Sequence, residues 1–435
     1  METQNEQFVY MAVIEGQIVL DSVLHVGSGE ALEYVGASCC FRDGAGRLVI
    51  PGSSLAGVFI SRILELTQDE NLLKKMTAKH KASTKEASLH SSVFRFATAR
   101  LVAEESLPPS ISQVRDMIRI DITTRTAKEG GKFAKEIVWP GLRFLFRLEL
   151  DMSHLTGQEA EDLLALSWRV LAGEWGALGF VGGSSARGMG WFHLEGLSLR
   201  LVDSVPSLRA WIEGQPLEPV PNERLPRIDN AAMGHKVWDL RLDIRQEPGG
   251  YGIWPAIVRT PKGDPHSEAD VGFTWVYRFS LDSDKKWGKR LVQVIPGSSL
   301  RGAARSLLAR LARSGRVDWT TQDVADLFGN QDMASPLRFC DAYLDADDRY
   351  KMVQERVALD AFTRGVYGSA KFNLEPLFGG TFTGRIALQR GNPPNETGLK
   401  MIQALFDWGG EDFPFLLLGG GGSPLVWRDV SHGEN

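Results

Sequence analysis

The chain has 435 residues, of which 43% are hydrophobic and 24% charged, and its formal net charge at pH 7 is −5. This length and composition favour two or three folded domains and exclude an intrinsically disordered chain. No apolar run reaches the roughly 18–20 residues of a membrane span, and residues 1–7 do not resemble a secretory signal, so we expect a cytoplasmic protein.

The first half begins with Val9–Val19, which we predict to be the first strand. A loop and a hairpin follow and lead into the turn Pro51-Gly52-Ser53-Ser54, where Ser54 is expected to be the N-cap of a helix. Another strand, a second helix and a glycine-rich loop are then predicted over Leu142–Leu150, Gly157–Leu171 and Leu178–Trp191.

Residues 204–227 contain five prolines, a composition typical of a semi-stiff linker. After them, Val237–Ile244 alternates between apolar and polar residues, as a new first strand should. We therefore expect a first domain over residues 1–203, a linker over residues 204–236 and a second domain over residues 237–435.

Three signatures of the first half return in the second half in the same order. They are Ile50–Gly57 with Ile295–Gly302 at an offset of 245 residues, Ile120–Arg125 with Leu359–Arg364 at 239, and Leu178–Trp191 with Leu416–Trp427, ending at 236. Repetition at nearly one offset indicates that the protein is a tandem duplication.

The order strand, helix, strands, helix, strand predicts an α+β fold in each half. It is typical of an elaborated ferredoxin-like, or RRM-like, domain, here duplicated in tandem. In the second half the helices are expected at Leu300–Arg313, with Ser299 as its N-cap, and at Glu396–Phe406. Sheets of this kind have an open face on which RNA can lie.

The serine-bearing helix starts and the glycine runs are candidates for phosphate binding. Unpaired N–H groups and hydroxyls at a helix N-terminus attract phosphate, and a glycine run lets the backbone approach one closely. The candidate residues are Ser53, Ser54, Ser298, Ser299, Arg301, Arg305, Gly182, Gly183, Arg187, Gly420 and Gly421. Taken singly, each signal also fits a capped helix on a sheet or an ordinary tight turn.

Together these segments resemble the RAMP superfamily, the repeat-associated backbone and processing proteins of CRISPR systems. Within it they are similar to the backbone subunits of type III effectors, and the duplication suggests a double subunit of the type III-D kind. The segments that carry the resemblance are Pro51–Gly57, Pro296–Gly302, Leu337–Ala342, Glu355–Asp360, Gly182–Gly190 and Gly419–Gly422.

The resemblance implies an RRM-like palm that grips guide RNA and, in each half, a thumb hairpin that kinks the guide–target duplex. The thumbs would lie at Thr123–Phe133 and Phe362–Phe372, with phosphate contacts from Arg125, Lys132, Arg364 and Lys371. The implied partners are guide RNA, target RNA, other RAMP-type backbone subunits and a large signature subunit. Base pairing by the guide would then read the target sequence.

In the type III family a single aspartate, ahead of the hairpin that leads to the Pro-Gly-Ser-Ser turn, cuts the target RNA. In the first half this place falls near Cys39, which cannot act as that carboxylate. In the second half Asp270 is the first candidate, and Asp264 and His266 are close enough in sequence to assist. Such a carboxylate acts as a base or holds a divalent metal, Mg or Mn, whose ligands are unassigned, and no organic cofactor is expected.

Three alternatives compete with RNA-guided cleavage. The chain is a purely structural double backbone subunit if the Asp270 loop is an ordinary polar loop. The repeat-RNA processing branch of the superfamily relies on histidine chemistry, for which His25 is the candidate in a comparable place. A free-standing tandem RNA-binding protein is disfavoured by the acidic net charge.

Overall fold

The computed structural model describes residues 10–31, 36–67, 92–121, 126–228, 235–244, 259–261, 271–330, 333–345, 350–351, 353–360, 362–375, 377–378, 380–389, 393–409, 416–418 and 423–431. Among these residues, no helix is both long enough and apolar enough to cross a membrane.

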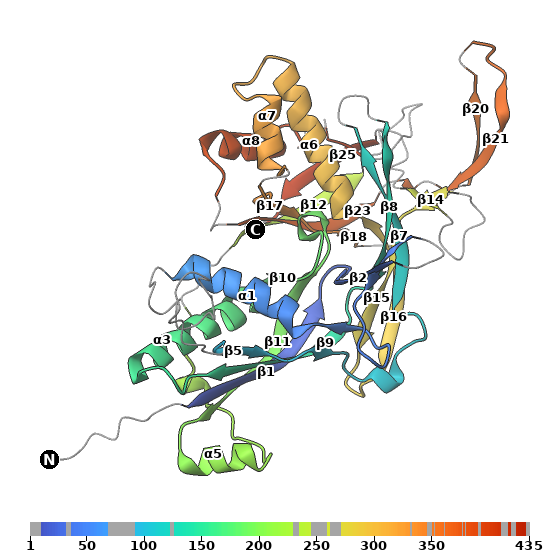
Figure 1. The fold of residues 1–435 in the computed structure, drawn as a ribbon. Coiled ribbons are helices and arrows are strands. Elements are labelled where there is room, and N and C mark those ends of the chain that lie inside the picture. Colours follow the sequence, from blue (N-terminus) through green and yellow to red (C-terminus); the bar gives the residue numbers. More distant parts are fainter. Residues whose placement is uncertain are drawn as a thin grey trace, which may run out of the picture.

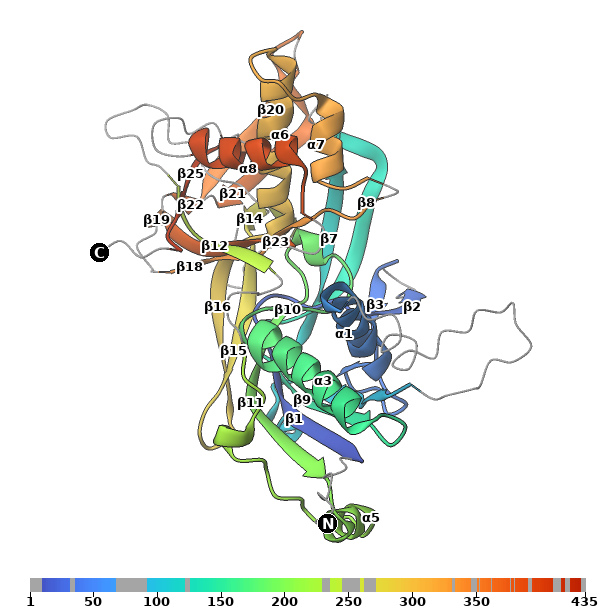
Figure 2. The same cartoon turned by 90° about the vertical axis from the view of Figure 1, so that its left-hand side faces the viewer.

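A five-stranded antiparallel sheet, in the order β10-β11-β1-β9-β5, forms the centre of the first half. Its strands are β1 (Met11–Leu20), β5 (Phe94–Phe96), β9 (Arg143–Asp151), β10 (Gly179–Phe180) and β11 (Trp191–Val202). Helices α1 (Gly52–Leu66) and α3 (Gly157–Trp168) cover one face (Figure 1 and Figure 2). Leaving out the short edge strand β10, the chain forms the sheet and its helices as β-α-β-β-α-β, the element order of a ferredoxin-like domain.

The core of the first half follows from the alternation along the strands and the periodicity of the helices. On β1 the side chains that point toward the helices are the buried Ala12, Ile14, Ile18 and Leu20. On α1 the buried Leu55, Phe59 and Ile63 recur every four residues and so form one stripe against the sheet. The Phe59 ring meets several aromatic rings edge-on, those of Phe94, Phe96 and Trp175.

The second half repeats this sheet with the order β24-β25-β12-β23, and both β17 and β18 pair with the outer edge of β23. The strands are β12 (His235–Ile244), β17 (Leu337–Phe339), β18 (Ala342–Leu344), β23 (Thr381–Gln389), β24 (Leu416–Leu418) and β25 (Ser423–Asp429). Helices α6 (Gly297–Arg313) and α8 (Glu396–Asp407) take the places of α1 and α3, and α7 (Thr321–Leu327) is added.

Each half also carries a long hairpin, and the two hairpins pair in the same register. They are β7 (Ser112–Ile120) with β8 (Ala127–Val138), and β20 (Gln354–Leu359) with β21 (Val366–Glu375). The pair Arg115 and Lys135 in the first corresponds to Gln354 and Leu374 in the second, an offset of 239 residues at both positions. The described parts of the segments predicted to be thumbs, residues 126–133 and 362–372, lie in these hairpins, and we therefore call the hairpins the first and second thumb. The hairpins are longer than the predicted segments because their strands extend back into the body of each half.

The remaining elements connect these units. The strands are β2 (Gly27–Ala31), β3 (Ser38–Cys40), β4 (Val49–Ile50), β6 (Ala99–Arg100), β13 (Arg259–Pro261), β14 (Val271–Phe273), β15 (Trp275–Leu281), β16 (Trp287–Ile295), β19 (Tyr350–Lys351) and β22 (Leu377–Phe378). The helical pieces are α4 (Trp175–Ala177), α5 (Val205–Ile212), a π-helical turn over Arg169–Glu174, and 3-10 turns at Glu104–Ser106, Ser185–Arg187 and Asn222–Arg224.

A helix lies within the residues predicted to be the linker. Residue Ser204 closes a capping box with Ser207, and Pro206 occupies the first turn, where its missing N–H costs nothing. Helix α5 therefore forms directly after β11, and the first strand of the second half, β12, begins at His235.

The hairpin β15–β16, which we call the arm, reaches from the second half onto the first (Figure 1 and Figure 2). Its side chains Val276, Phe279 and Val292 belong to the hydrophobic core of the first half. The amide of Phe279 donates to the carbonyl of Pro140 at 2.9 Å. The two halves are thus joined by a shared core as well as by the linker.

Candidate nucleic-acid interface

The repeated Pro-Gly-Ser-Ser turn begins a helix in both halves, but its serines are not the caps. Pro51 and Pro296 occupy the N-cap positions, each with φ of −58°, and neither helix has a side-chain cap. The amides of Ser54 and Ser299 instead donate to these proline carbonyls at 3.0 and 2.8 Å. The prediction that Ser54 and Ser299 are N-caps is therefore wrong, because the proline, with φ already restricted, takes that place.

The glycine of this turn is required by packing. A Cβ on Gly52 would lie 2.2 Å from the carbonyl oxygen of Phe96, and one on Gly297 would lie 2.2 Å from that of Phe339. Both helix starts thus lie directly against the second strand of their own sheet. This close approach explains why the glycine recurs, whether or not a ligand binds.

The first turn of α6 already has an acidic neighbour. The amide of Gly297 donates to the carboxylate of Asp341 at 2.8 Å, and the Arg115 guanidinium lies 3.8 Å from the other carboxylate oxygen. Asp341 is 1% exposed, and its burial raises its pKa to about 6. The amide of Gly297 is therefore already hydrogen-bonded to a carboxylate. A phosphate near Ser298 and Ser299 would have to bind on the solvent-facing side of this turn.

The glycine loop of the first half contacts this helix start. A Cβ on Gly188 would lie 3.0 Å from the backbone nitrogen of Gly297, so the two backbones touch. In the same loop the amide of Gly183 donates to the carbonyl of His25 at 2.9 Å, and Gly182 has φ of +81°. We call the contact of Gly182–Gly190 with the start of α6 and with β17 the seam.

We use the term seam cations for four of the basic residues at the seam: Lys135, Arg187, Arg301 and Arg305. Burial, together with the nearby charges of Arg187 and Arg305, lowers the pKa of Arg301 to about 10. The pKa of Lys135 is lowered by burial and then by Arg187, and that of Arg305 by burial. No carboxylate among the described residues lies within ion-pair distance of these four side chains.

The seam cations differ in how firmly the protein holds them. The Arg301 guanidinium donates to the carbonyl of Phe328 and lies over its ring, and Lys135 donates to the hydroxyl of Ser184 at 3.1 Å. Arg187 is exposed. The loop residues Gly182 and Gly183 beside it are exposed as well, so the seam presents both charge and bare backbone to solvent.

The open face of the first sheet, by contrast, is electrically balanced. On the side of the sheet away from the helices, Arg143 pairs with Glu195 at 2.5 Å and Arg147 with Glu149 at 2.9 Å. The linker helix also lies on this face, because the Arg147 guanidinium stacks 5.2 Å from the ring of Trp211. The face on which RNA was expected to lie thus offers paired charges, whereas the seam offers unpaired ones.

The thumb lysines are paired with acids. Lys132 lies 3.2 Å from Asp116, and Lys371 lies 2.8 Å from Glu355; these are homologous pairs at the offset of 239. Arg364 is exposed in the turn of the second hairpin with a left-handed backbone, φ +54°. Predicted residues Arg125, Gly420 and Gly421 lie outside the described residues.

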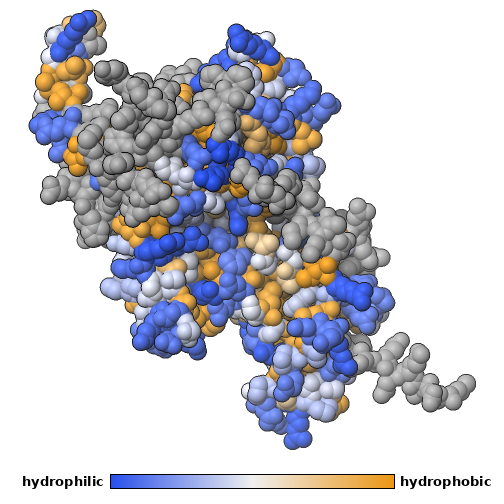
Figure 3. All heavy atoms as spheres, turned by 180° about the vertical axis from the view of Figure 1, so that it is seen from behind, coloured by the Kyte–Doolittle hydropathy of each residue, from blue (hydrophilic) through white to orange (hydrophobic). Residues whose placement is uncertain are grey.

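Exposed apolar side chains follow both thumbs. The exposed fractions are 53% for Ile118, 54% for Ile120, 41% for Val357, 63% for Leu359 and 97% for Phe362. The first four occupy homologous positions on one side of each hairpin, since they are spaced by two residues. Figure 3 shows hydrophobic surface along the second hairpin where it projects from the body.

The cleavage candidates Asp270, Asp264 and His266 lie outside the described residues. The strand that follows them pairs in parallel with the thumb, Val271 with Leu374, just as Ser38 pairs with Lys135 in the first half. In this register the residue before β14 corresponds to Ala37, which is fully buried, and Cys39 corresponds to Gly272. No cluster of three or more His, Cys, Asp or Glu side chains able to hold a metal occurs in the described ranges.

His25 is held in the interior. It is 4% exposed, with Nδ1 2.7 Å from the Glu136 carbonyl and Nε2 3.3 Å from the Ser38 hydroxyl. Burial lowers its pKa. A buried imidazole ring with both nitrogens hydrogen-bonded to the protein is typical of a structural histidine. This disfavours the alternative in which His25 processes repeat RNA.

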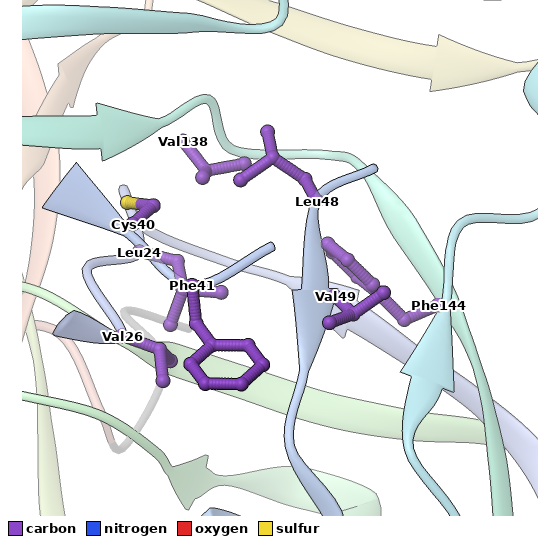
Figure 4. A pocket seen from close by; sticks show the side chains of 8 residues that line it. All are labelled: Leu24, Val26, Cys40, Phe41, Leu48, Val49, Val138 and Phe144. Atoms are coloured by element: carbon purple, nitrogen blue, oxygen red, sulfur yellow. The ribbon is translucent and has the colours of Figure 1, made fainter. Parts of the chain in front are cut away.

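The pocket next to His25 is apolar (Figure 4). Its lining consists of Leu24, Val26, Cys40, Phe41, Leu48, Val49, Val138 and Phe144. Burial raises the pKa of the Cys40 thiol to about 12, so this thiol is not a nucleophile at neutral pH. The pocket therefore contributes to packing under the hairpin that precedes α1.

Sequence reasoning missed Lys135, Arg115 and Asp341 as parts of the interface. Lys135 is in a hairpin strand and Asp341 at a strand corner, and nothing local distinguishes them from other charged residues. The repeat itself held a signal, because the position of Arg115 is Gln354 in the second half. A buried charge that is present in one half and absent from the other, as with Arg115, indicates that this residue makes a contact that its counterpart does not make.

Comparison with protein families matches both halves to one family. A family model of the RAMP superfamily matches residues 18–193 and residues 290–423. The first region contains α1, the first thumb and the glycine loop, and the second contains α6 and the second thumb. No curated protein matches the chain significantly.

Proposed function

The chain belongs to the RAMP superfamily, and from this premise we propose that it is a guide-RNA-binding subunit of a CRISPR ribonucleoprotein effector. Two fused domains make it a double backbone subunit, and we assign it to a type III effector of the III-D kind. The partners in this proposal are guide RNA, target RNA, other RAMP-type backbone subunits and a large signature subunit.

The seam cations carry the proposal. In a chain with a net charge of −5, these four cations lie close together, with no carboxylate of the described residues within ion-pair distance of them, and burial and mutual repulsion lower three of their pKa values. An RNA backbone supplies the missing negative charge at closely spaced points and releases counterions when it binds. The seam is therefore the expected path of the guide backbone.

Two exposed glycines support this path. Gly57 and Gly302 lie one turn into α1 and α6, where a Cβ would meet nothing within 4 Å. A glycine inside a helix costs about 1 kcal/mol relative to alanine. Packing does not require these glycines, so a ligand backbone lying close against both helices explains why they recur.

The thumbs support contact with bases. Their exposed apolar residues, of which Phe362 is the most exposed, suit stacking on nucleobases better than contact with phosphates. The pairing of Lys132 and Lys371 with acids leaves the apolar side as the more distinctive surface. We propose that the thumbs press on the guide–target duplex while the seam holds the guide.

Cleavage of target RNA by the second half is part of the proposal. Asp270 directly precedes β14, whereas the homologous place in the first half is the buried Ala37. A carboxylate at that point can act as a base or hold a divalent metal, Mg or Mn. The alternative is a non-catalytic double backbone subunit, in which the same RNA is bound and not cut.

The test of the RNA path replaces Lys135 and Arg187 with glutamine. These two cations are chosen because Arg301 also supports the protein through Phe328. Guide-RNA binding is measured by fluorescence anisotropy over a range of salt, and the dependence of log affinity on log salt should weaken by about 0.7 for each lost phosphate contact.

The control is Arg209→Gln with Arg224→Gln, an equal change of charge at exposed positions after β11. It should leave the salt dependence unchanged. If the seam variant and this control bind guide RNA equally, the RNA does not follow the seam.

A further inference from the structure

The seam has a docking face on the second half that is apolar at its centre. Cys340 and Ala387 pack against Phe180 and Trp191 of the first half, and Ala387 is fully buried. Beside them, Arg338 lies 4.5 Å from the centre of the Phe180 ring and donates to the hydroxyl of Ser185.

The homologous face of the first half has different chemistry. Arg338 pairs with Ala387 across β17 and β23, and Arg95 pairs with Glu149 across β5 and β9, so Glu149 stands where the second half has Ala387. Glu149 is bound to Arg147 at 2.9 Å. The first half therefore presents a carboxylate at the place that is fully buried in the seam.

The residues of the buried ion pair at the seam, Asp341 and Arg115, are also not repeated in the other half. Asp341 follows β17 by two residues and accepts from the start of α6, and the residue in that place after β5 is Thr98. Its partner Arg115 has Gln354 as its counterpart on the second thumb. The buried ion pair between the halves thus has no counterpart at the outer ends of the chain.

The arm is the third difference. In the second half the hairpin before Pro296 pairs from Trp275 with Gln293 to Leu281 with Trp287. In the first half the chain between β3 and β4 turns back within a few residues, with a single bridge between Arg42 and Leu48. The first half has no hairpin long enough to enter the core of a neighbour as the arm does.

We propose that the two copies of the domain have diverged at this docking face so that the seam forms once in each chain. A second copy that approached head to tail would bring Glu149 into an apolar contact, leave Thr98 in place of Asp341, and lack the arm. Such a contact would bury Glu149 together with its partner Arg147 against apolar side chains, and the loss of water around both charges is unfavourable, so the contact between copies is disfavoured. A RAMP-type domain that adds to this chain in the same manner is therefore a different protein.

This inference rests on the duplication and holds whether or not the chain binds RNA. Sedimentation velocity of the full chain, over a wide range of protein concentration, should show one species at the monomer mass of 48.0 kDa. Head-to-tail growth would appear as a ladder of multiples of this mass and would overturn the proposal.

A second experiment places the glutamate of the first half at the homologous position in the seam. Ala387→Glu should open the seam, and hydrogen–deuterium exchange should rise by about tenfold or more in peptides over residues 178–191 and 336–342, because the larger side chain has no space where Ala387 is fully buried against Phe180 and Trp191. Peptides over β1 should not change.

The matched control is the reverse change at the homologous position, Glu149→Ala, which should leave exchange at the seam unchanged. If Ala387→Glu exchanges like the wild type at both seam peptides, Glu149 does not distinguish the two faces, and the proposed divergence is wrong. Either result is independent of the salt dependence of RNA binding.

Discussion

At the residue scale, the glycines of the repeated helix start serve two different purposes. Gly52 and Gly297 let the helix lie against a strand, since each would place a Cβ 2.2 Å from a carbonyl oxygen. Gly57 and Gly302, one turn later, face open space. The same spacing in both halves thus combines a packing requirement with a surface that is left bare.

The packing glycines should not tolerate a side chain. Gly52→Ala and Gly297→Ala each force the helix start away from the strand, and we expect each to lower the free energy of unfolding by about 1–3 kcal/mol. Urea unfolding followed by circular dichroism measures the effect. Alanine variants at Gly52 and Gly297 that are as stable as the wild type, or more stable, would contradict the packing argument.

The Asp341 carboxyl should make the seam sensitive to pH. Burial raises its pKa to about 6, from 3.8 in an ordinary aspartate, so the folded protein holds the proton more tightly than the unfolded chain does. Its contribution to stability is therefore full below about pH 4 and is lost as the pH rises through about 6, a change of roughly 3 kcal/mol at most.

Comparison of the wild type with Asp341→Asn isolates this contribution. The free energy of unfolding of the wild type minus that of the variant should fall as the pH rises from about 4.5 to 7.5, because the aspartate loses its proton over this interval and the asparagine does not titrate. A difference that is constant, or that grows over this interval, would show that Arg115 rather than burial governs the Asp341 pKa.

At the scale of elements, helices α1 and α6 present the same bare surface toward the proposed guide path. Each begins at a proline without a side-chain cap, packs one stripe into its own core, and exposes a glycine on the other side. The seam adds the glycine loop of the first half to the start of α6, so the second helix is surrounded by more positive charge than the first.

Stability and RNA binding should respond in opposite directions at these glycines. Gly57→Ala and Gly302→Ala should each raise the free energy of unfolding by roughly 0.5–1 kcal/mol, because alanine favours the helix. Guide-RNA binding should weaken, because a methyl group then separates the RNA from the helix. Thermal unfolding and fluorescence anisotropy measure the two effects on the same samples.

Gly157→Ala in the first turn of α3 is the control. A Cβ there also meets nothing within 4 Å, and this helix start is not part of the seam. It should not weaken RNA binding. If all three alanine variants bind guide RNA as the wild type does, no RNA backbone approaches α1 and α6 closely.

At the scale of the whole molecule, the duplication produced two domains with one fold and different surfaces. The thumbs keep the same register and homologous ion pairs. The halves differ in the docking face, in the arm, and in the residue that precedes the strand paired in parallel with each thumb, β3 in the first half and β14 in the second. The cleavage proposal depends on the last of these differences, because Asp270 has Ala37 as its counterpart.

Cleavage should therefore depend on the second half alone. In the assembled effector, Asp270→Ala should bind target RNA normally and lose one cut, with a decrease in rate of about 10²–10⁴. Cys39→Ala should have no effect. Product bands from labelled target RNA measure both outcomes, with Asp264→Ala and His266→Ala tested alongside. Cleavage by all of these variants at wild-type positions and rates, unaffected by chelation of divalent metals, would favour the non-catalytic alternative.

The sequence by itself determined the duplication, the order of the elements and the RAMP resemblance, because repeats and hydrophobic periodicity are local patterns that survive without knowledge of contacts. It also placed Arg187 and Arg301 among the candidates. It did not determine which charges are paired, since Lys132 and Lys371 meet acids across a hairpin.

Only the tertiary structure decided where unpaired positive charge accumulates. The seam unites a loop, a thumb strand and a helix from different halves, and electrostatic interactions depend on distance in space and on burial rather than on position in the chain. For the same reason the contact of Arg115 with Asp341 has no signature in either segment alone. The fold could be predicted from local sequence patterns, whereas the candidate RNA-binding site forms only where the two halves contact each other.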